Sequence, residues 1–172
     1  MSSAAASPSP ASRLEQLLDA VERETATTLR VLRAYPAEQS DLRPHARSKT
    51  ALELAWMFTL EQSISVAALR DELDLSGGFP PVPGDLPTVI DAFERSREDY
   101  LRLLRQASEA ELKGTVRFPT GPGEIGDWPK IDFLWFILCD QIHHRGQFSV
   151  YLRMSGAKVP SIYGPTADEP WF

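Results

Sequence analysis

Apolar residues recur every three or four positions along most of the chain, which is the spacing of one face of an α-helix. In the first such stretch, Leu14, Leu17, Val21 and Leu32 lie on one stripe. No stretch of the sequence shows a strand-like alternation of apolar and polar residues that is as clear as this helical spacing. Four helices are predicted, over residues 12–34, 50–73, 86–107 and 129–154.

Local chemistry supports these helix ends. Thr50 and Glu53 have the spacing of a capping box at the start of the second helix. Pro36 ends the first helix because proline disfavours helical geometry in the residue before it. Asp127 is a candidate N-cap for the fourth helix, and Gly156 is a candidate stop.

The connection over residues 108–128 is longer than most loops between bundle helices, so we expect it to cross the bundle or to cover a site. Within it, residues 115–118 could form a short extended stretch. The tail after Met154 carries Val159, Ile162 and Tyr163, which suggests that it packs back on the body. We predict an all-α four-helix bundle over residues 13–172, with a long crossover connection before the last helix and a disordered tail over residues 1–12.

Composition narrows the classes of function. The chain has 172 residues, with 18 basic and 24 acidic side chains and a net charge of −6, which argues against a nucleic-acid partner. Its single cysteine excludes an intrachain disulfide. No apolar run approaches the roughly 18 residues of a membrane span, and the N-terminus lacks the pattern of a signal peptide. We expect a cytoplasmic protein that does not insert into membranes.

The predicted fourth helix is apolar almost all round, so we expect it to be the most buried helix. It nevertheless carries polar residues that a plain core does not need. Asp140 and His144 are spaced i, i+4 and share a face with Gln147 and Tyr151. A buried aspartate is costly unless it is paired or binds a metal ion. Two readings remain open: a structural Asp140–His144 pair that fixes helix packing, or two metal ligands.

The predicted second helix offers a possible third member. Glu61 lies on an apolar stripe one turn after Met57, whose simplest role is to fill a gap in the core. Glu61 could instead lie at the edge of the stripe in contact with solvent. If the two helix faces oppose each other, Glu61, Asp140 and His144 converge, and two carboxylates with one imidazole would suit a divalent ion.

Other residues of the fourth helix have simpler interpretations. His143 lies off the face of Asp140, and Arg145 lies well away from it, so Arg145 is expected at the surface or at an interface. Cys139 is expected to be a buried, inert thiol. Gly146 is expected to allow the close approach of another backbone. His45, in the loop before the second helix, is expected at the surface.

Two runs of sequence carry a family resemblance. The run DQIHHRGQFSVYLRMSGAKVPSIYGPTADEP is similar to the C-terminal signature of the DinB/YfiT-like family, and ELAWMFTLEQ resembles its second-helix motif. The resemblance implies a four-helix bundle, often dimeric, with a divalent metal ion held by three histidines. Those positions correspond here to Met57, Asp140 and His144, so His144 alone keeps the family's residue type.

The resemblance also implies a function, in two versions. In the first, an altered site binds zinc, nickel or manganese through Asp140 and His144, and the protein is a thiol-dependent transferase or a hydrolase of a small electrophile. Glu61 is then a third ligand or a catalytic base that orients water, and Met57, Gln147 and Tyr151 line the substrate pocket. In the second, the protein is a metal-free, non-catalytic member that binds a small molecule or serves as a dimeric scaffold. A homodimer is expected in both.

Overall fold

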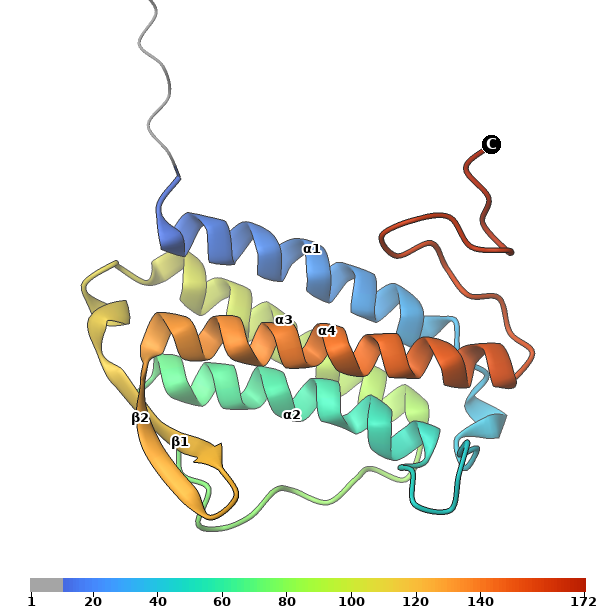
Figure 1. The fold of residues 1–172 in the computed structure, drawn as a ribbon, viewed down its shortest axis with the longest axis horizontal. Coiled ribbons are helices and arrows are strands. Elements are labelled where there is room, and N and C mark those ends of the chain that lie inside the picture. Colours follow the sequence, from blue (N-terminus) through green and yellow to red (C-terminus); the bar gives the residue numbers. More distant parts are fainter. Residues whose placement is uncertain (1–10) are drawn as a thin grey trace, which may run out of the picture.

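The four predicted helices are present and pack side by side. The computed structural model of the protein describes residues 11–172, so most of the predicted tail over residues 1–12 lies outside the described residues (Figure 1). Short 3₁₀ turns at Ala37–Gln39 and Glu111–Lys113 lie in the connections. The helices are α1 (Arg13–Arg33), α2 (Ala51–Leu69), α3 (Leu86–Gln106) and α4 (Lys130–Met154).

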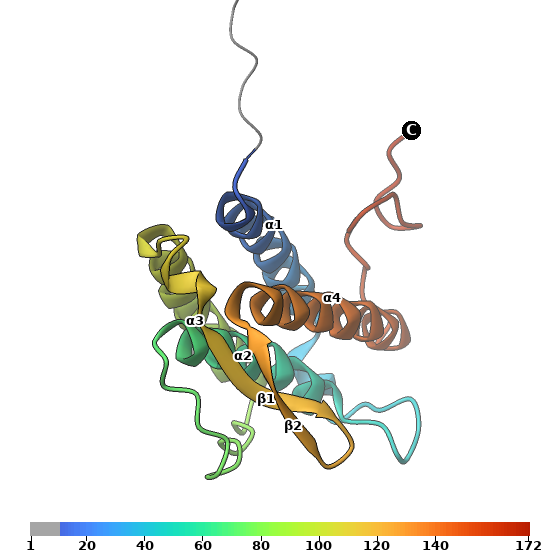
Figure 2. The same cartoon turned by 60° about the vertical axis from the view of Figure 1, so that its left-hand side comes forward.

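Each helix has two neighbours in the bundle. α1 and α2 both contact α3 and α4, so α1 lies diagonally opposite α2, and α3 lies opposite α4 (Figure 2). Residues 70–85 run along the length of the bundle, and α2 and α3 therefore point the same way (Figure 1). The connection over residues 108–128 crosses one end of the bundle, from α3 to the diagonally opposite α4. The all-α four-helix fold is thus confirmed, and the connection between the second and third helices is longer than predicted, because α2 ends at Leu69 rather than at residue 73.

The connection before α4 contains a β-hairpin. β1 (Thr115–Gly121) pairs antiparallel with β2 (Glu124–Pro129), with Val116 opposite Trp128. The predicted extended stretch over residues 115–118 is therefore the first half of β1. Phe118 packs on Phe133 of α4, with ring centroids 4.9 Å apart. The hairpin is held to the bundle by these apolar contacts.

The helix ends follow the predicted chemistry at Thr50 and Gly156 and depart from it at Asp127, and a further capping box that was not predicted begins α1 at Ser12. Capping boxes join Ser12 to Glu15 at α1 and Thr50 to Glu53 at α2, and Gly156 ends α4 in the left-handed region with φ of +77°. Asp127 does not cap α4, because it lies within β2. α4 starts directly from the hairpin, and the Lys130 N–H donates to the Gly114 carbonyl at 2.8 Å.

The buried interior consists of two hydrophobic clusters separated by polar residues. One cluster joins Phe58, Phe93 and Phe148, and the other joins Leu17, Tyr100 and Phe133. Between them, α1, α2 and α4 contribute a set of buried polar side chains that we call the middle layer. The middle layer comprises Glu24, Thr25, Thr28, Thr59, Glu61, Gln62, Ser65, Gln141 and Arg145.

Arg145 lies in the middle layer, whereas its position off the Asp140 face led us to expect it at the surface or at an interface. Its side chain is 1% exposed and donates to Glu24 Oε2 at 2.6 Å. It also donates to the hydroxyl of Tyr163, which lies in the C-terminal tail. The prediction failed because Glu24, the neutralising partner, comes from a helix 121 residues away in the sequence. The same contacts, together with the buried Val159, confirm that the tail packs on the body.

The outward side of α4 is open, which corrects three further expectations. The helix is apolar nearly all round, yet Phe136, Val150 and Met154 are exposed because the other helices cover only its inner side. Cys139 is exposed rather than buried. A Cβ atom on Gly146 would meet no atom of the described chain within 4 Å, so this glycine does not serve a close backbone approach. None of the described helices combines the length and the apolar character that a membrane span requires.

Candidate metal centre

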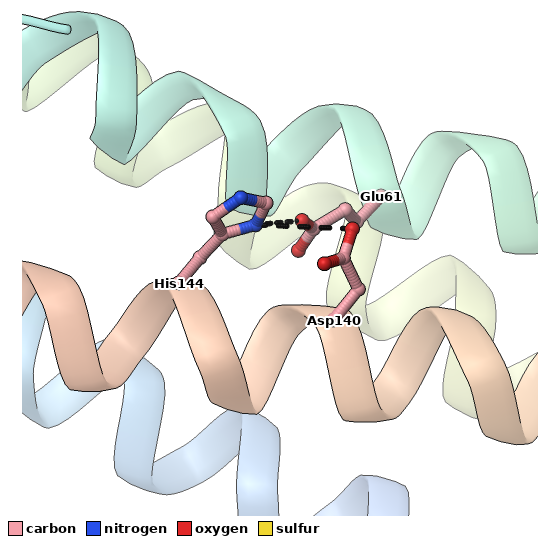
Figure 3. A group of neighbouring side chains, drawn as sticks. All are labelled: Glu61, Asp140 and His144. Carbon is pink, nitrogen blue, oxygen red and sulfur yellow. Dashed lines mark hydrogen bonds and ion pairs between the residues drawn. The ribbon is translucent and has the colours of Figure 1, made fainter. Parts of the chain in front are cut away.

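Three side chains from the middle of α2 and α4 converge on one point. Glu61, Asp140 and His144 each offer one potential ligand atom, and these atoms all lie within 4.8 Å of one another (Figure 3). Glu61 Oε1 lies 2.5 Å from His144 Nδ1, and Asp140 Oδ2 lies 4.0 Å from the same nitrogen. The two helix faces oppose each other, so the condition on which the expected convergence depended is met.

The three side chains differ in how far they are exposed to solvent. The Glu61 side chain is 3% exposed, that of His144 15% and that of Asp140 40%. Glu61 is therefore not a solvated residue at the edge of its stripe. Asp140 is not the deeply buried carboxylate that the apolar character of α4 suggested. The centre is closed on the α2 side and is in contact with solvent at Asp140.

Burial and neighbouring charge alter the protonation of the centre. Desolvation raises the pKa of Glu61 to about 7, although the hydrogen bond and charge of His144 oppose this effect, and the charge of Asp140 adds to it. The hydrogen bond to Glu61 raises the pKa of His144 against the opposing effect of burial. Two carboxylates so close together repel each other, and a bound cation would relieve that repulsion.

The donor set fits a divalent metal ion. Glu61 Oε2 is buried and has no hydrogen-bond partner in the described part of the chain. A buried carboxylate oxygen without a partner is costly, and metal coordination is one of the few ways to satisfy it. Carboxylate oxygen and imidazole nitrogen are both ordinary ligands of zinc and of manganese. Behind Glu61, the Gln141 amide makes only a long 3.4 Å hydrogen bond to the Phe58 carbonyl.

The other residues predicted for the site lie around this centre but not in it. Met57 lines a cavity beside α2, one turn before Glu61. Gln147 is exposed, and its amide donates to His143 Nε2 at 2.7 Å. Tyr151 is buried, and its hydroxyl donates to the Lys49 carbonyl at 2.8 Å. Their contribution to a substrate pocket stays a prediction.

Glu24, the partner that allows Arg145 to be buried, was not among the residues predicted from the sequence. Glu24 lies at helical spacing from Leu17, Val21 and Val31, on the buried stripe of α1. An acidic residue on that stripe signals a buried partner with the opposite charge. Glu24 on α1 thus carries the same sequence signal as Glu61 on α2, an acidic residue on an apolar stripe.

Comparison with known proteins identifies a family and a relative that match this chain over most of its length. A family model described as the DinB family matches residues 1–170. An uncharacterized protein of Bacillus subtilis (strain 168), YrdA, is 26% identical over 162 residues, which is 91% of each chain.

Solved structures of DinB-like proteins share the fold. A DinB-like protein from Bacillus cereus ATCC 10987 has a TM-score of 0.72 at 23% identity, covering 87% of this chain and 97% of that one. A DinB-like protein from Bacillus subtilis, YjoA, has a TM-score of 0.69 at 16% identity, covering 86% and 97%. A structure from Exiguobacterium sibiricum 255-15 has a TM-score of 0.64 at 18% identity, covering 89% and 98%.

Proposed function

The protein belongs to the DinB family, and on that basis we propose that Glu61, Asp140 and His144 hold a divalent metal ion that acts on a small molecule. The observation that carries this proposal is the convergence of three potential ligand atoms within 4.8 Å, one of them on a deeply buried carboxylate. Open ligand positions would be left for water or substrate, as in catalytic rather than structural metal sites.

Each residue has a role that follows from its surroundings. His144 and Asp140, spaced one turn apart on α4, act as ligands from one side. Glu61 approaches from α2 and acts as the third ligand, or as the base that orients a bound water through its second oxygen. A bound ion would supply Lewis acidity and lower the pKa of a coordinated water or thiol. Zinc, nickel and manganese are the candidate ions.

The reaction class that fits best is transfer of a small thiol, or of water, to a small electrophilic molecule. The opening at Asp140 allows a small substrate to reach the centre, whereas the closed side at Glu61 excludes bulk water from the base. Exclusion of water strengthens electrostatic interactions inside such a site.

A metal-free, non-catalytic binding protein is the second candidate. The observation that favours it is the direct hydrogen bond between Glu61 and His144, which partly satisfies both groups without an ion. Met57 stands where the family resemblance implies a histidine, and a thioether is a poor ligand for these ions.

Elemental analysis of protein purified without a histidine tag separates the two candidates. We expect about one equivalent of a transition metal ion in the wild-type protein and in His143→Ala, and none in His144→Ala. His143 is the matched control because it neighbours His144 but lies outside the three-residue group. Failure of the wild type to bind zinc, nickel or manganese after dialysis against each ion would contradict the metal proposal. Equal loss of metal in both histidine variants would contradict the assignment of the ligands.

A further inference from the structure

A cavity of about 520 Å³ lies against the first half of α2, next to the candidate metal centre. Its volume is within the range of roughly 300–1,000 Å³ that is usual for small-molecule sites. Trp56, Met57 and Leu60 line it from α2. Because Met57 and Glu61 are one turn apart on the same face of α2, they are separated by about 6 Å along the helix axis. The Met57 end of the cavity therefore lies about one helical turn from Glu61, a distance that a ligand of ordinary metabolite size spans, although the three residues of the candidate metal centre do not themselves line the cavity.

One side of the cavity is positively charged. Arg43, Arg47 and Lys49 all line it, and Glu53 is the acidic residue among its lining side chains. The Glu53 carboxylate already accepts a hydrogen bond from the Thr50 N–H at 2.6 Å in the capping box of α2. Three cations around one cavity are notable in a chain whose net charge is −6, and such a cavity attracts anions.

The basic segment is held in position before any ligand binds. The Ser48 N–H donates to the His45 carbonyl at 2.9 Å, and the Ala51 N–H donates to the Leu42 carbonyl at 2.9 Å. Tyr151 of α4 donates its hydroxyl hydrogen to the Lys49 carbonyl. The backbone that carries the three cations is therefore fastened to both helices of the metal centre, which reduces the entropic cost of ordering it on binding.

The opposite wall of the cavity is apolar. Phe79 and Val82 line it from the segment that connects α2 to α3, and both are exposed. The Trp56 indole N–H donates to the Pro80 carbonyl at 3.2 Å, which holds this segment against α2. The cavity thus offers a charged side for an acidic group and an apolar side for a carbon skeleton.

We propose that this cavity binds a small organic anion, with its carboxylate or phosphate group held by Arg43, Arg47 and Lys49 and its apolar body against Trp56 and Phe79. The same molecule is the substrate of the metal centre, a step that rests on the proposed function. Anion binding itself does not depend on the metal ion and can be tested without it.

Isothermal titration calorimetry on the full chain tests the anion site, with and without one equivalent of zinc. The probes are 3-phenylpropanoate, phenylphosphonate and the neutral 3-phenylpropanamide, which all present a similar aromatic body. We expect at least one of the two anions to bind in both metal states, about tenfold or more tightly than the amide. The ranking of the two anions identifies which acidic group the cavity prefers. Equal binding of the amide, or no binding of either anion, would overturn the proposal.

Three variants locate the bound anion. Arg43→Gln combined with Arg47→Gln should weaken anion binding at least about tenfold and leave zinc affinity unchanged. Arg95→Gln is the matched control, since Arg95 is exposed on α3 outside this cavity, and it should bind as the wild type does. Loss of anion binding in His144→Ala but not in the double variant would place the anion on the metal ion and overturn the proposal. Anion binding by a wild-type chain that takes up no zinc would refute the metal proposal alone.

Discussion

Arg145 of α4 donates to Glu24 Oε2 of α1 at 2.6 Å, although both side chains are almost completely buried. Arg145 also donates to the Glu24 backbone carbonyl at 2.8 Å, and the Tyr163 hydroxyl donates to the same carboxylate at 2.7 Å. A buried charge pair with this many hydrogen bonds costs little net free energy while both partners are present. Removal of one partner leaves the other charge buried and unpaired.

Arg145→Met should therefore lower the free energy of unfolding by about 3–5 kcal/mol. The double variant Glu24→Leu, Arg145→Met should recover most of that loss, because it removes both charges together. Arg33→Met is the comparison, since Arg33 pairs with Glu94 at the surface and should cost less than about 1 kcal/mol. Urea unfolding followed by circular dichroism measures all three, and a mild effect of Arg145→Met would refute the structural role.

The same pair predicts how stability depends on pH. Burial alone would raise the pKa of Glu24, but hydrogen bonds from Tyr163, Arg145 and Arg23 outweigh it and hold the pKa below its usual value of 4.5. A carboxyl whose pKa is lower in the folded state contributes stability above its unfolded pKa and loses that stability as pH falls through the folded pKa. The urea concentration at the midpoint of unfolding should therefore decrease as the pH is lowered below 4.5. Comparison with Glu24→Gln, whose midpoints should change less over that range, isolates the contribution of this carboxyl.

At Gln62, in contrast to Arg145, removal of a buried polar group should increase the stability of the fold. Its side chain is 1% exposed, and neither polar atom of its amide has a hydrogen-bond partner among residues 11–172. Gln62→Met, which keeps the size of the side chain but removes the buried amide, should raise the free energy of unfolding by about 1 kcal/mol. Gln106→Met, on the exposed end of α3, should change it by less than about 0.5 kcal/mol. Destabilisation by Gln62→Met would mean that the amide is satisfied in solution.

Metal binding should stabilise the fold. An ion that binds the folded chain alone, at a hundred times its dissociation constant, adds about 2.7 kcal/mol. For a chain of this length the expected rise in Tm is about 5–10 °C. Differential scanning calorimetry with added zinc should show this rise in the wild type and in His143→Ala, but not in His144→Ala. A rise of equal size in all three would place the ion elsewhere.

The open side of α4 predicts a homodimer. Phe136, Val150 and Met154 are exposed there, and apolar surface of this kind is often covered by a second copy of the chain. Light scattering at micromolar concentration should give twice the mass of one chain, and Val150→Glu should shift it toward the monomer. Arg95→Glu, an exposed substitution on α3, should leave the mass unchanged. A wild-type monomer would contradict the prediction.

The helices and two of the three residues of the candidate metal centre could be predicted from the sequence, because both depend on local spacing. The apolar period located α1 to α4 within a few residues, and the i, i+4 relation placed Asp140 and His144 on one face. Contact with Glu61 could only be conjectured, since it depends on how α2 packs on α4. The anion cavity joins residues 43–49 to residues 79–82, so no local pattern predicted it.

The solvent exposure of individual side chains on α4 could not be predicted from the sequence. The apolar composition of α4 suggested burial all round, yet the Asp140 side chain is 40% exposed, Cys139 is exposed, and the charged Arg145 is buried. A helix that is apolar on every side has no hydrophobic direction, so its composition does not say which side meets its neighbours. Contacts with residues on the other helices determine which side of α4 is buried.

The middle layer also fixes how far each helix can slide along the others. A shift of one helical turn moves a side chain by about 5.4 Å. Such a shift would replace one leucine contact by another within the two hydrophobic clusters. It would also separate Arg145 from Glu24 and His144 from Glu61, which would leave charged or polar groups buried without partners. The alignment of α1 and α2 against α4 is thus specified by two polar pairs, much as a single buried asparagine sets the register of a coiled coil.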